Sequence, residues 1–243
     1  MSDIFNLLNM VSKNELNNLS NSSYTYNGHK VPRVTSIISK CIHSDGLMYW
    51  ANNLGLKQHQ SYSKFMKEAA GVGTMCHDNI DAFHENMAHE VPENIDYRSL
   101  NAYNSFLLWF NDINNLAAIE IVFHEKPLVC PWFGGTLDAL YKINGACYLI
   151  DFKTSNHVTF NYFLQLAAYR YILKTEYDIN VDGVIVLQLN KNSISYNEYT
   201  LNFSHPEHFK FIEMCERTFL SLVYSYYNIS IVEDEYNKLK LGG

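Results

Sequence analysis

The chain has few cysteines, and their spacing fits no common metal-binding or redox motif. The 243 residues include five cysteines, at positions 41, 76, 130, 147 and 215, and none of them forms a C-x-x-C pair. This pattern argues against a zinc ribbon and an iron–sulfur cluster, and the odd count argues against a disulfide framework. We therefore expect reduced, buried thiols and no cluster cofactor.

Long apolar runs and targeting signals are also missing. No stretch approaches the roughly 20 apolar residues that span a membrane. The N-terminal segment, MSDIFN, lacks the basic start and apolar run of a secretory signal, and it is not arginine-rich like a transit peptide. We expect a soluble protein of the cytoplasm, which would be the host cytoplasm if the source is viral.

Basic residues are scarce. The chain has 18 Lys and Arg against 25 Asp and Glu, which gives a net charge of −7. Affinity for a polyanion comes largely from basic side chains that displace counterions. The charge therefore disfavours a protein that coats nucleic acid. It disfavours a metal-dependent enzyme less, because such an enzyme needs basic residues only along the substrate path.

The pattern of apolar residues predicts one α/β domain over residues 1–243, with a mainly helical part at 1–116 and a core at 117–230. A hydrophobic fraction of 47% is enough to bury a core. We expect a short helix within 1–23 and an extended segment or helix start at 31–38. Further helices are expected near 44–56, 62–90, 96–116, 158–176 and 205–228. Strands are expected at 118–129, 134–143, 146–152, 183–189 and 195–201. Asn144-Gly145 between two apolar runs predicts a tight hairpin.

Two aspartates fall within this predicted hairpin. Asp138 and Asp151 lie in otherwise apolar strands, and counting back from the Asn144-Gly145 turn places them near each other across the pair. Burying two carboxylates side by side is costly unless a cation neutralises them. Oxygen ligands of this kind suit Mg²⁺, with Mn²⁺ as a substitute.

Lys153 follows Asp151 by two positions and therefore projects from the same face of the strand. Carboxylates that hold a metal and an ammonium that orients water and stabilises developing charge form a hydrolytic unit. A buried Asp–Lys pair that only closes a strand end is the alternative. The sequence favours the hydrolytic interpretation, because Gly134-Gly135-Thr136 precedes one acid and Thr154-Ser155 follows the lysine.

The arrangement resembles the PD-(D/E)XK nuclease superfamily, in its RecB-like branch. Leu137-Asp138 corresponds to the first motif, without its proline, and Asp151-Phe152-Lys153 to the D-x-K motif. Four further segments match, and their order along the chain agrees: GTMCH at 73–77, QLAAY at 165–169, PRVTSI at 32–37 and LMYW at 47–50. The last two are similar to segments of mitochondrial genome maintenance exonucleases and phage relatives without an iron–sulfur cluster. Relatives commonly carry arginine where this chain has Val72.

This resemblance implies a restriction-endonuclease-like fold, in which a central mixed sheet is flanked by helices. It implies metal binding by His77, Asp138, Asp151 and the backbone carbonyl of Phe152. It also implies a third acid on the preceding strand, Glu120, with Glu125 as the competing choice. The remaining implied site residues are Gln165 and Tyr169 beside the active site, with Thr154, Ser155, Trp50 and Thr35 as DNA contacts.

Some of these residues have a second interpretation. Thr154 and Ser155 could cap a turn after the strand as well as contact a phosphate. Asp81 and His84 lie four and seven positions after His77 on the same helical face. They either extend the site or form a solvated polar face. We assign no role to His89, His124 or His157.

Taken together, the motifs predict a Mg²⁺-dependent DNA exonuclease that acts on single-stranded ends. Kinship suggests a role in replication, repair or recombination, with proteins of those processes as possible partners. Kinship and a composition rich in Asn, Tyr, Ile and Lys suggest a phage or viral source. Two alternatives remain: a structure-specific endonuclease of the same chemistry, and a catalytically inactive nucleic-acid-binding module that keeps only the fold.

Overall fold

The computed structural model describes residues 24–42, 62–86 and 89–241 of the chain. Two predicted helices, one within residues 1–23 and one at 44–56, lie outside the described residues. The second of these carries Trp50, so the prediction for Trp50 also lies outside them.

A five-stranded sheet forms the centre of the structure. Its order follows the chain: β3 (Ile119–Val129), β4 (Gly134–Ile143), β5 (Ala146–Lys153), β6 (Gly183–Leu189) and β7 (Tyr196–Asn202). Neighbouring strands are antiparallel except β5 and β6, which are parallel. A parallel pair needs a crossover connection, and α7 (Phe160–Glu176) provides it.

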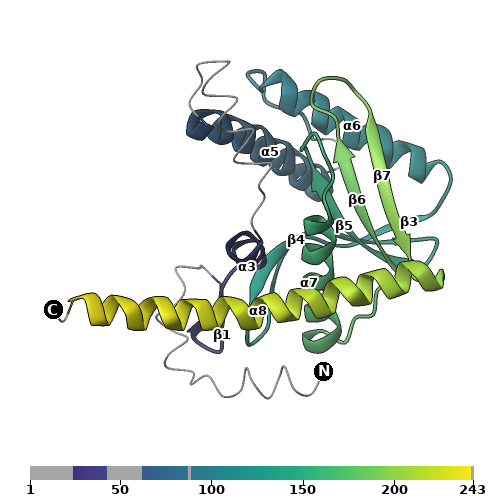
Figure 1. Cartoon of the computed structure of the whole chain (residues 1–243). Coiled ribbons are helices and arrows are strands. Elements are labelled where there is room, and N and C mark those ends of the chain that lie inside the picture. The colour runs from purple at the N-terminus through teal and green to yellow at the C-terminus, as the bar shows by residue number, and fades with distance from the viewer. Residues whose placement is uncertain (1–23, 43–61, 87–88, 242–243) are drawn as a thin grey trace.

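Helices cover both faces of this sheet (Figure 1). One layer contains α5 (Tyr62–Glu85) and α6 (Tyr97–Asn114), and the other contains α3 (Val34–Cys41), α7 and α8 (Pro206–Leu241). The fold-class prediction is therefore confirmed: the protein is α/β, with a central mixed sheet flanked by helices. In the described part of the chain, no helix has both the length and the apolar character that crossing a bilayer requires.

Each face of the sheet has its own hydrophobic core, because successive side chains of a strand point to opposite faces. Leu149 of β5 packs in the core beneath α7 and α8, whereas the next residue, Ile150, packs in the core beneath α5 and α6. Val184 and Ile185 of β6 are divided in the same way. The central strands are therefore buried on both sides, and any polar side chain within them must find a partner.

The Asn144-Gly145 turn joins β4 and β5 as predicted, with φ values of 51° and 83°. A second hairpin of the same kind was not predicted. Asn27-Gly28, with φ values of 47° and 81°, joins the short strands β1 (Thr25–Tyr26) and β2 (His29–Lys30). The same dipeptide signal was present there, but the flanking strands have only two residues each.

Two predicted helix ends were wrong. α5 ends at Glu85 rather than near residue 90, because the chain turns there and the His89 ring reaches back to Asn79 at 2.9 Å. α8 continues to Leu241 rather than ending at 228. Its added turns carry an (i, i+4) ion pair between Asp234 and Lys238, an interaction that supports an exposed helix.

Candidate metal centre

The strand register brings two acids opposite each other. The residues that flank Glu125 on β3 pair with the residues that flank Asp138 on β4, so Glu125 and Asp138 are cross-strand neighbours. Glu125 adopts a positive φ of 39°, an uncommon backbone conformation for a residue other than glycine. Such conformations are frequent where a fold positions a functional side chain.

Glu120, the acid that the resemblance favoured, lies elsewhere. It pairs with Lys142 across the strands and forms a 2.9 Å ion pair with the Lys142 ammonium. Lys142 is four residues from Asp138, which corresponds to about 13 Å along a strand. The Glu120 side chain is 63% exposed. The structure therefore does not bring Glu120 to Asp138, whereas Glu125, the competing choice, lies next to it.

Asp138 is oriented by the point at which β4 and β5 separate. Their pairing runs from the turn to Ala139 and Ile150 and stops there. Beyond it, the backbone N–H of Phe152 donates to Oδ2 of Asp138 at 2.7 Å. The carboxylate thus replaces the backbone acceptor that a continuing strand would supply. Its other oxygen, Oδ1, lies 3.8 Å from Nδ1 of His77.

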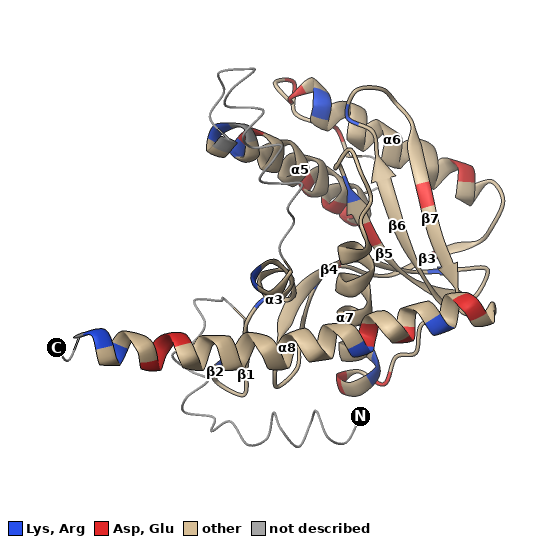
Figure 2. Cartoon of the chain, in the orientation of Figure 1, with Lys and Arg blue, Asp and Glu red and all other residues tan. Residues whose placement is uncertain are grey.

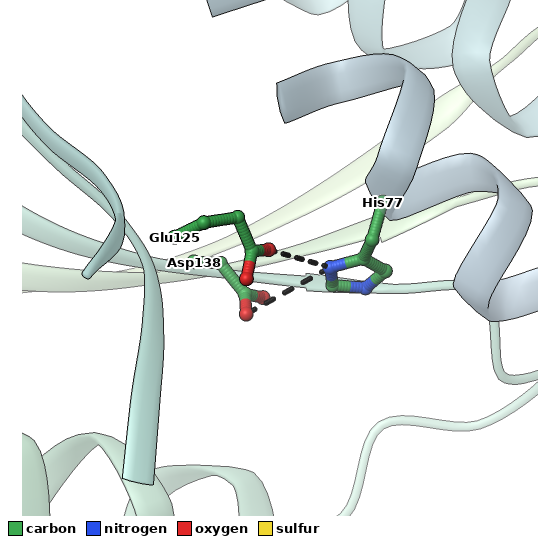
Figure 3. A group of neighbouring side chains, drawn as sticks. All are labelled: His77, Glu125 and Asp138. Atoms are coloured by element: carbon green, nitrogen blue, oxygen red, sulfur yellow. Dashed lines mark ion pairs between the residues drawn. The ribbon is translucent and has the colours of Figure 1, made fainter. Parts of the chain in front are cut away.

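His77 of α5 completes a three-residue cluster with these acids (Figure 3). Its Nδ1 lies 3.7 Å from Glu125 Oε1 and 3.8 Å from Asp138 Oδ1. One ligand atom from each of the three residues falls within 4.8 Å of the others, a grouping that could hold a metal ion. Burial lowers the pKa of His77, but the carboxylates of Asp138 and Glu125 outweigh this effect, so the pKa is raised.

The other ring nitrogen of His77 is held by the backbone. Nε2 lies 3.1 Å from the carbonyl oxygen of Phe152, which can only accept a hydrogen bond. Nε2 therefore donates, and in the neutral ring Nδ1 keeps the lone pair that a metal requires. The Phe152 carbonyl, predicted as a metal ligand, here orients the histidine.

Asp151 is buried beside this cluster, with 1% of its surface exposed. Its Oδ1 accepts hydrogen bonds from Lys153 Nζ at 2.6 Å and from Gln165 Nε2 at 3.1 Å. Among the described residues its Oδ2 has no hydrogen-bond partner. Burial raises the pKa of Asp151 to about 6; Lys153 opposes this rise and Asp138 adds to it. A buried carboxylate oxygen without a partner is costly unless a cation or water meets it.

Helix α7 supports this arrangement with three residues on one face. Gln165 holds Asp151, and its amide lies 3.5 Å from the Tyr169 hydroxyl. Tyr162, three residues before Gln165, places its ring 5.0 Å from Lys153 Nζ, in a cation–π contact. Tyr162 was not predicted, although its spacing from Gln165 and Tyr169 is the (i, i+3, i+7) pattern of one helical face.

The cluster lines a cleft of about 480 Å³ between α5 and the strands β3 and β4. Four of its seven lining residues are acidic, and the full lining is Gly73, Thr74, His77, Asp78, Asp81, Glu125 and Asp138. A cleft with this much negative charge repels an anionic substrate. A bound cation would reverse that repulsion.

Asp81 and His84 do not form the solvated polar face that was one interpretation. Asp81 lines the cleft and accepts a 2.6 Å hydrogen bond from Nδ1 of His124, a residue given no role from the sequence. The His84 ring packs against Phe106 and hydrogen-bonds the buried Tyr141 hydroxyl. Burial, reinforced by His124, lowers the pKa of His84 to about 4.

The described residues that were predicted to contact DNA lie in two places: Thr154 and Ser155 follow β5, and Thr35 lies on α3. Thr154 lines a cavity beyond Lys153. The Ser155 hydroxyl donates to the carbonyl of His157 at 3.0 Å and accepts from Tyr162 at 3.0 Å, so it stabilises the turn after β5. Thr35 is exposed on α3, which packs against α7 and α8.

Comparisons with known proteins leave the resemblance as a prediction. No protein-family model matches the chain, and no curated protein matches it. The solved structures that match include one described as the crystal structure of SSO0001, which is similar over 94% of this chain and 86% of that one. The two chains are 13% identical and superpose with a TM-score of 0.38, which is too low to establish a shared fold.

Proposed function

We propose that this chain is a metal-dependent nuclease that hydrolyses phosphodiester bonds in DNA. One observation carries the proposal: His77, Glu125 and Asp138 converge within 4.8 Å, beside a buried Asp151 that holds Lys153 at 2.6 Å. Asp151 is buried, and Asp138 and Lys153 are largely buried beside it, an arrangement that is costly for stability alone. They are the groups that metal-assisted hydrolysis of a phosphate ester requires.

The residues present fit a divalent cation. Carboxylate oxygens suit Mg²⁺ and Mn²⁺, and one imidazole shifts the preference toward Mn²⁺. Asp151, the residue before Phe152, keeps a second carboxylate oxygen, Oδ2, that has no partner among the described residues. When bound, such a cation activates water and neutralises negative charge on the phosphate.

The protein's own groups have distinct tasks in this reaction. Asp138 and Glu125 would hold the cation, and His77 would add a nitrogen ligand, its ring oriented by the Phe152 carbonyl. Lys153 orients the attacking water and stabilises charge on the phosphate oxygens. The water oxygen forms a bond to phosphorus, the P–O ester bond breaks, and the leaving oxygen takes a proton. One product ends in a phosphate and the other in a hydroxyl.

The positions of Gln165, Tyr162 and Tyr169 support the same proposal. Gln165 and Tyr162 keep Asp151 and Lys153 in place through the contacts described above. The order of motifs along the chain supports membership of the PD-(D/E)XK superfamily and its RecB-like branch. That membership is part of the proposal.

We infer that the enzyme is an exonuclease on single-stranded ends. Figure 2 shows few basic residues over the sheet, and the net charge is −7. An acidic protein gains little affinity along the length of a duplex. A strand end that is admitted to the cation needs fewer basic contacts.

Linear and circular single strands of the same sequence test the proposal. We expect the linear strand to be degraded in Mg²⁺ or Mn²⁺ and the circle to persist. Rapid cleavage of the circle would show an endonuclease of the same chemistry. No hydrolysis of either strand in either metal would favour a non-catalytic binding module.

A further inference from the structure

A second cavity, of about 260 Å³, lies immediately beyond the catalytic lysine. Its walls are residues 154–156, which follow β5, and residues 188–192 at the end of β6, with Asn197 from β7. Lys153 and Gln188 are neighbours in the parallel pairing of β5 and β6. The cavity therefore begins one residue past Lys153, at the carboxyl ends of two parallel strands, where open α/β sheets bind their ligands.

The two cavities meet at one contact. Gly73 lines the acidic cleft, and Thr154 lines the second cavity. A Cβ atom placed on Gly73 would lie 3.3 Å from Oγ1 of Thr154. Gly73 and Thr154 therefore lie against each other, and the two cavities adjoin at this point.

The second cavity differs in chemistry from the first. Five of its nine lining residues carry side-chain amides, and its single charged lining residue is Lys191. Lys191 is half-buried, and within the described residues its ammonium has no hydrogen-bond or ion-pair partner. Burial lowers the pKa of Lys191, and the nearby Arg98 adds to this effect. A bound anion would offset both the burial of the Lys191 ammonium and its repulsion from Arg98.

The walls are held in place by their own hydrogen bonds. The Gln188 amide donates to the Ser155 carbonyl at 2.8 Å and accepts from Asn197 at 3.0 Å. Asn101 of α6 donates to the Lys191 carbonyl at 3.2 Å, which fixes the loop between β6 and β7. A cavity that is already organised spends less free energy on ordering when it binds.

We propose that this cavity binds the nucleotide next to the scissile phosphate, with Lys191 on the phosphate of that nucleotide and the amides on its sugar and base. The proposal rests on the proposed nuclease function. Side-chain amides offer both donors and acceptors, which suits the mixed polar groups of a nucleotide. Lysine contacts phosphate as a point charge and reads no sequence.

The test compares Lys191→Ala with Lys210→Ala, an equal change of charge at an exposed lysine of α8. The probe is a fluorescein-labelled single-stranded oligonucleotide with phosphorothioate linkages that resist hydrolysis, and its anisotropy is followed with Mg²⁺ present over a series of salt concentrations. We expect Lys191→Ala to weaken binding about tenfold and to reduce the salt slope by about 0.7, the value for one phosphate contact on a single strand. Lys210→Ala should match the wild type.

Equal affinity and salt slope in Lys191→Ala and wild type would overturn the subsite, as would a wild type that does not bind the oligonucleotide. Hydrolysis is measured separately with Mg²⁺ and Mn²⁺. A wild type that cleaves DNA while Lys191→Ala binds normally would leave the nuclease proposal standing without the subsite. A wild type that cleaves nothing while Lys191→Ala loses affinity would leave a nucleotide-binding cavity without the nuclease.

Discussion

Asp151 shows how the site depends on individual residues. Its carboxylate is buried, one oxygen is held by Lys153 and Gln165, and the other has no partner among the described residues. Burial raises the pKa of this group to about 6. The folded protein therefore maintains a carboxylate that would bind a proton readily, and a cation in the cleft would compete with that proton.

We predict that metal affinity depends on pH near this value. Below about pH 6 the folded protein holds a proton on Asp151, so Mn²⁺ must displace it, and affinity falls as the pH is lowered. Above this range Asp151 is already ionised, but His77, whose pKa is raised above its ordinary value, must still lose its proton, so the dependence continues until that histidine is neutral. Calorimetry of Mn²⁺ binding in two buffers of different ionisation enthalpy measures the proton release directly. Equal heats in both buffers at pH 6 would contradict this account.

The two candidate acids of β3 give a matched pair of variants. Glu125→Gln removes a carboxylate from the cluster, and we expect it to lower Mn²⁺ affinity and hydrolysis at least about tenfold, as changes at a metal site commonly do. Glu120→Gln breaks only an exposed ion pair with Lys142, worth less than about 1 kcal/mol, and should leave activity unchanged. The reverse result would restore Glu120 as the third acid.

The sequence identified Asp138, Asp151 and Lys153 because their spacing around one hairpin is local information. It could not choose between Glu120 and Glu125, because that choice depends on the register of β3 against β4. This register shifts between Ile121 and Phe123, at an irregularity that no local residue pattern predicted.

Among the elements, β4 and α7 meet closely, and a glycine makes the approach possible. A Cβ atom on Gly135 would lie 2.6 Å from the Tyr169 hydroxyl oxygen. Tyr169 is buried, and its hydroxyl lies beside Gln165, which holds Asp151. Gly135 is thus explained by the space that Tyr169 of α7 needs, whereas a Cβ atom on Gly134 would meet Val129 and Tyr24 instead.

Two glycine-to-alanine variants test this packing. Gly135→Ala forces Tyr169 to move, and we expect a loss of about 1–3 kcal/mol in the free energy of unfolding together with reduced activity. Gly71→Ala, on the exposed side of α5 with open space around it, should add about 0.5–1 kcal/mol. Denaturant unfolding measures both values. A Gly135→Ala protein as stable and active as wild type would contradict the packing argument.

The elements that the sequence predicted well are those with a local signal. β4 and β6 were predicted to the residue, because a turn dipeptide or a continuous apolar run delimits each of them. The end of α5 and the extension of α8 depend on contacts with distant residues. His89 with Asn79 and Lys40 with Glu233 are two such contacts, the second a 2.7 Å ion pair.

At the scale of the whole molecule, two adjoining cavities carry charge of opposite sign. The first is lined by four acids and the second by five amides and one lysine. Both lie at the same region of the sheet, where β4 separates from β5 and the parallel strands end. A net acidic protein can therefore bind a polyanion in one place, provided that a cation occupies the acidic cleft.

The dependence of hydrolysis on the metal and on Asp138 tests the central claim most directly. Wild type and Asp138→Asn are compared on end-labelled single-stranded DNA with Mg²⁺, with Mn²⁺ and with EDTA, and their thermal unfolding is recorded under the same conditions. We predict that the wild type cleaves DNA only with metal and that metal raises its Tm. Asp138→Asn should fold but lose both effects. Cleavage by Asp138→Asn at the wild-type rate, or cleavage by the wild type in EDTA, would contradict the account.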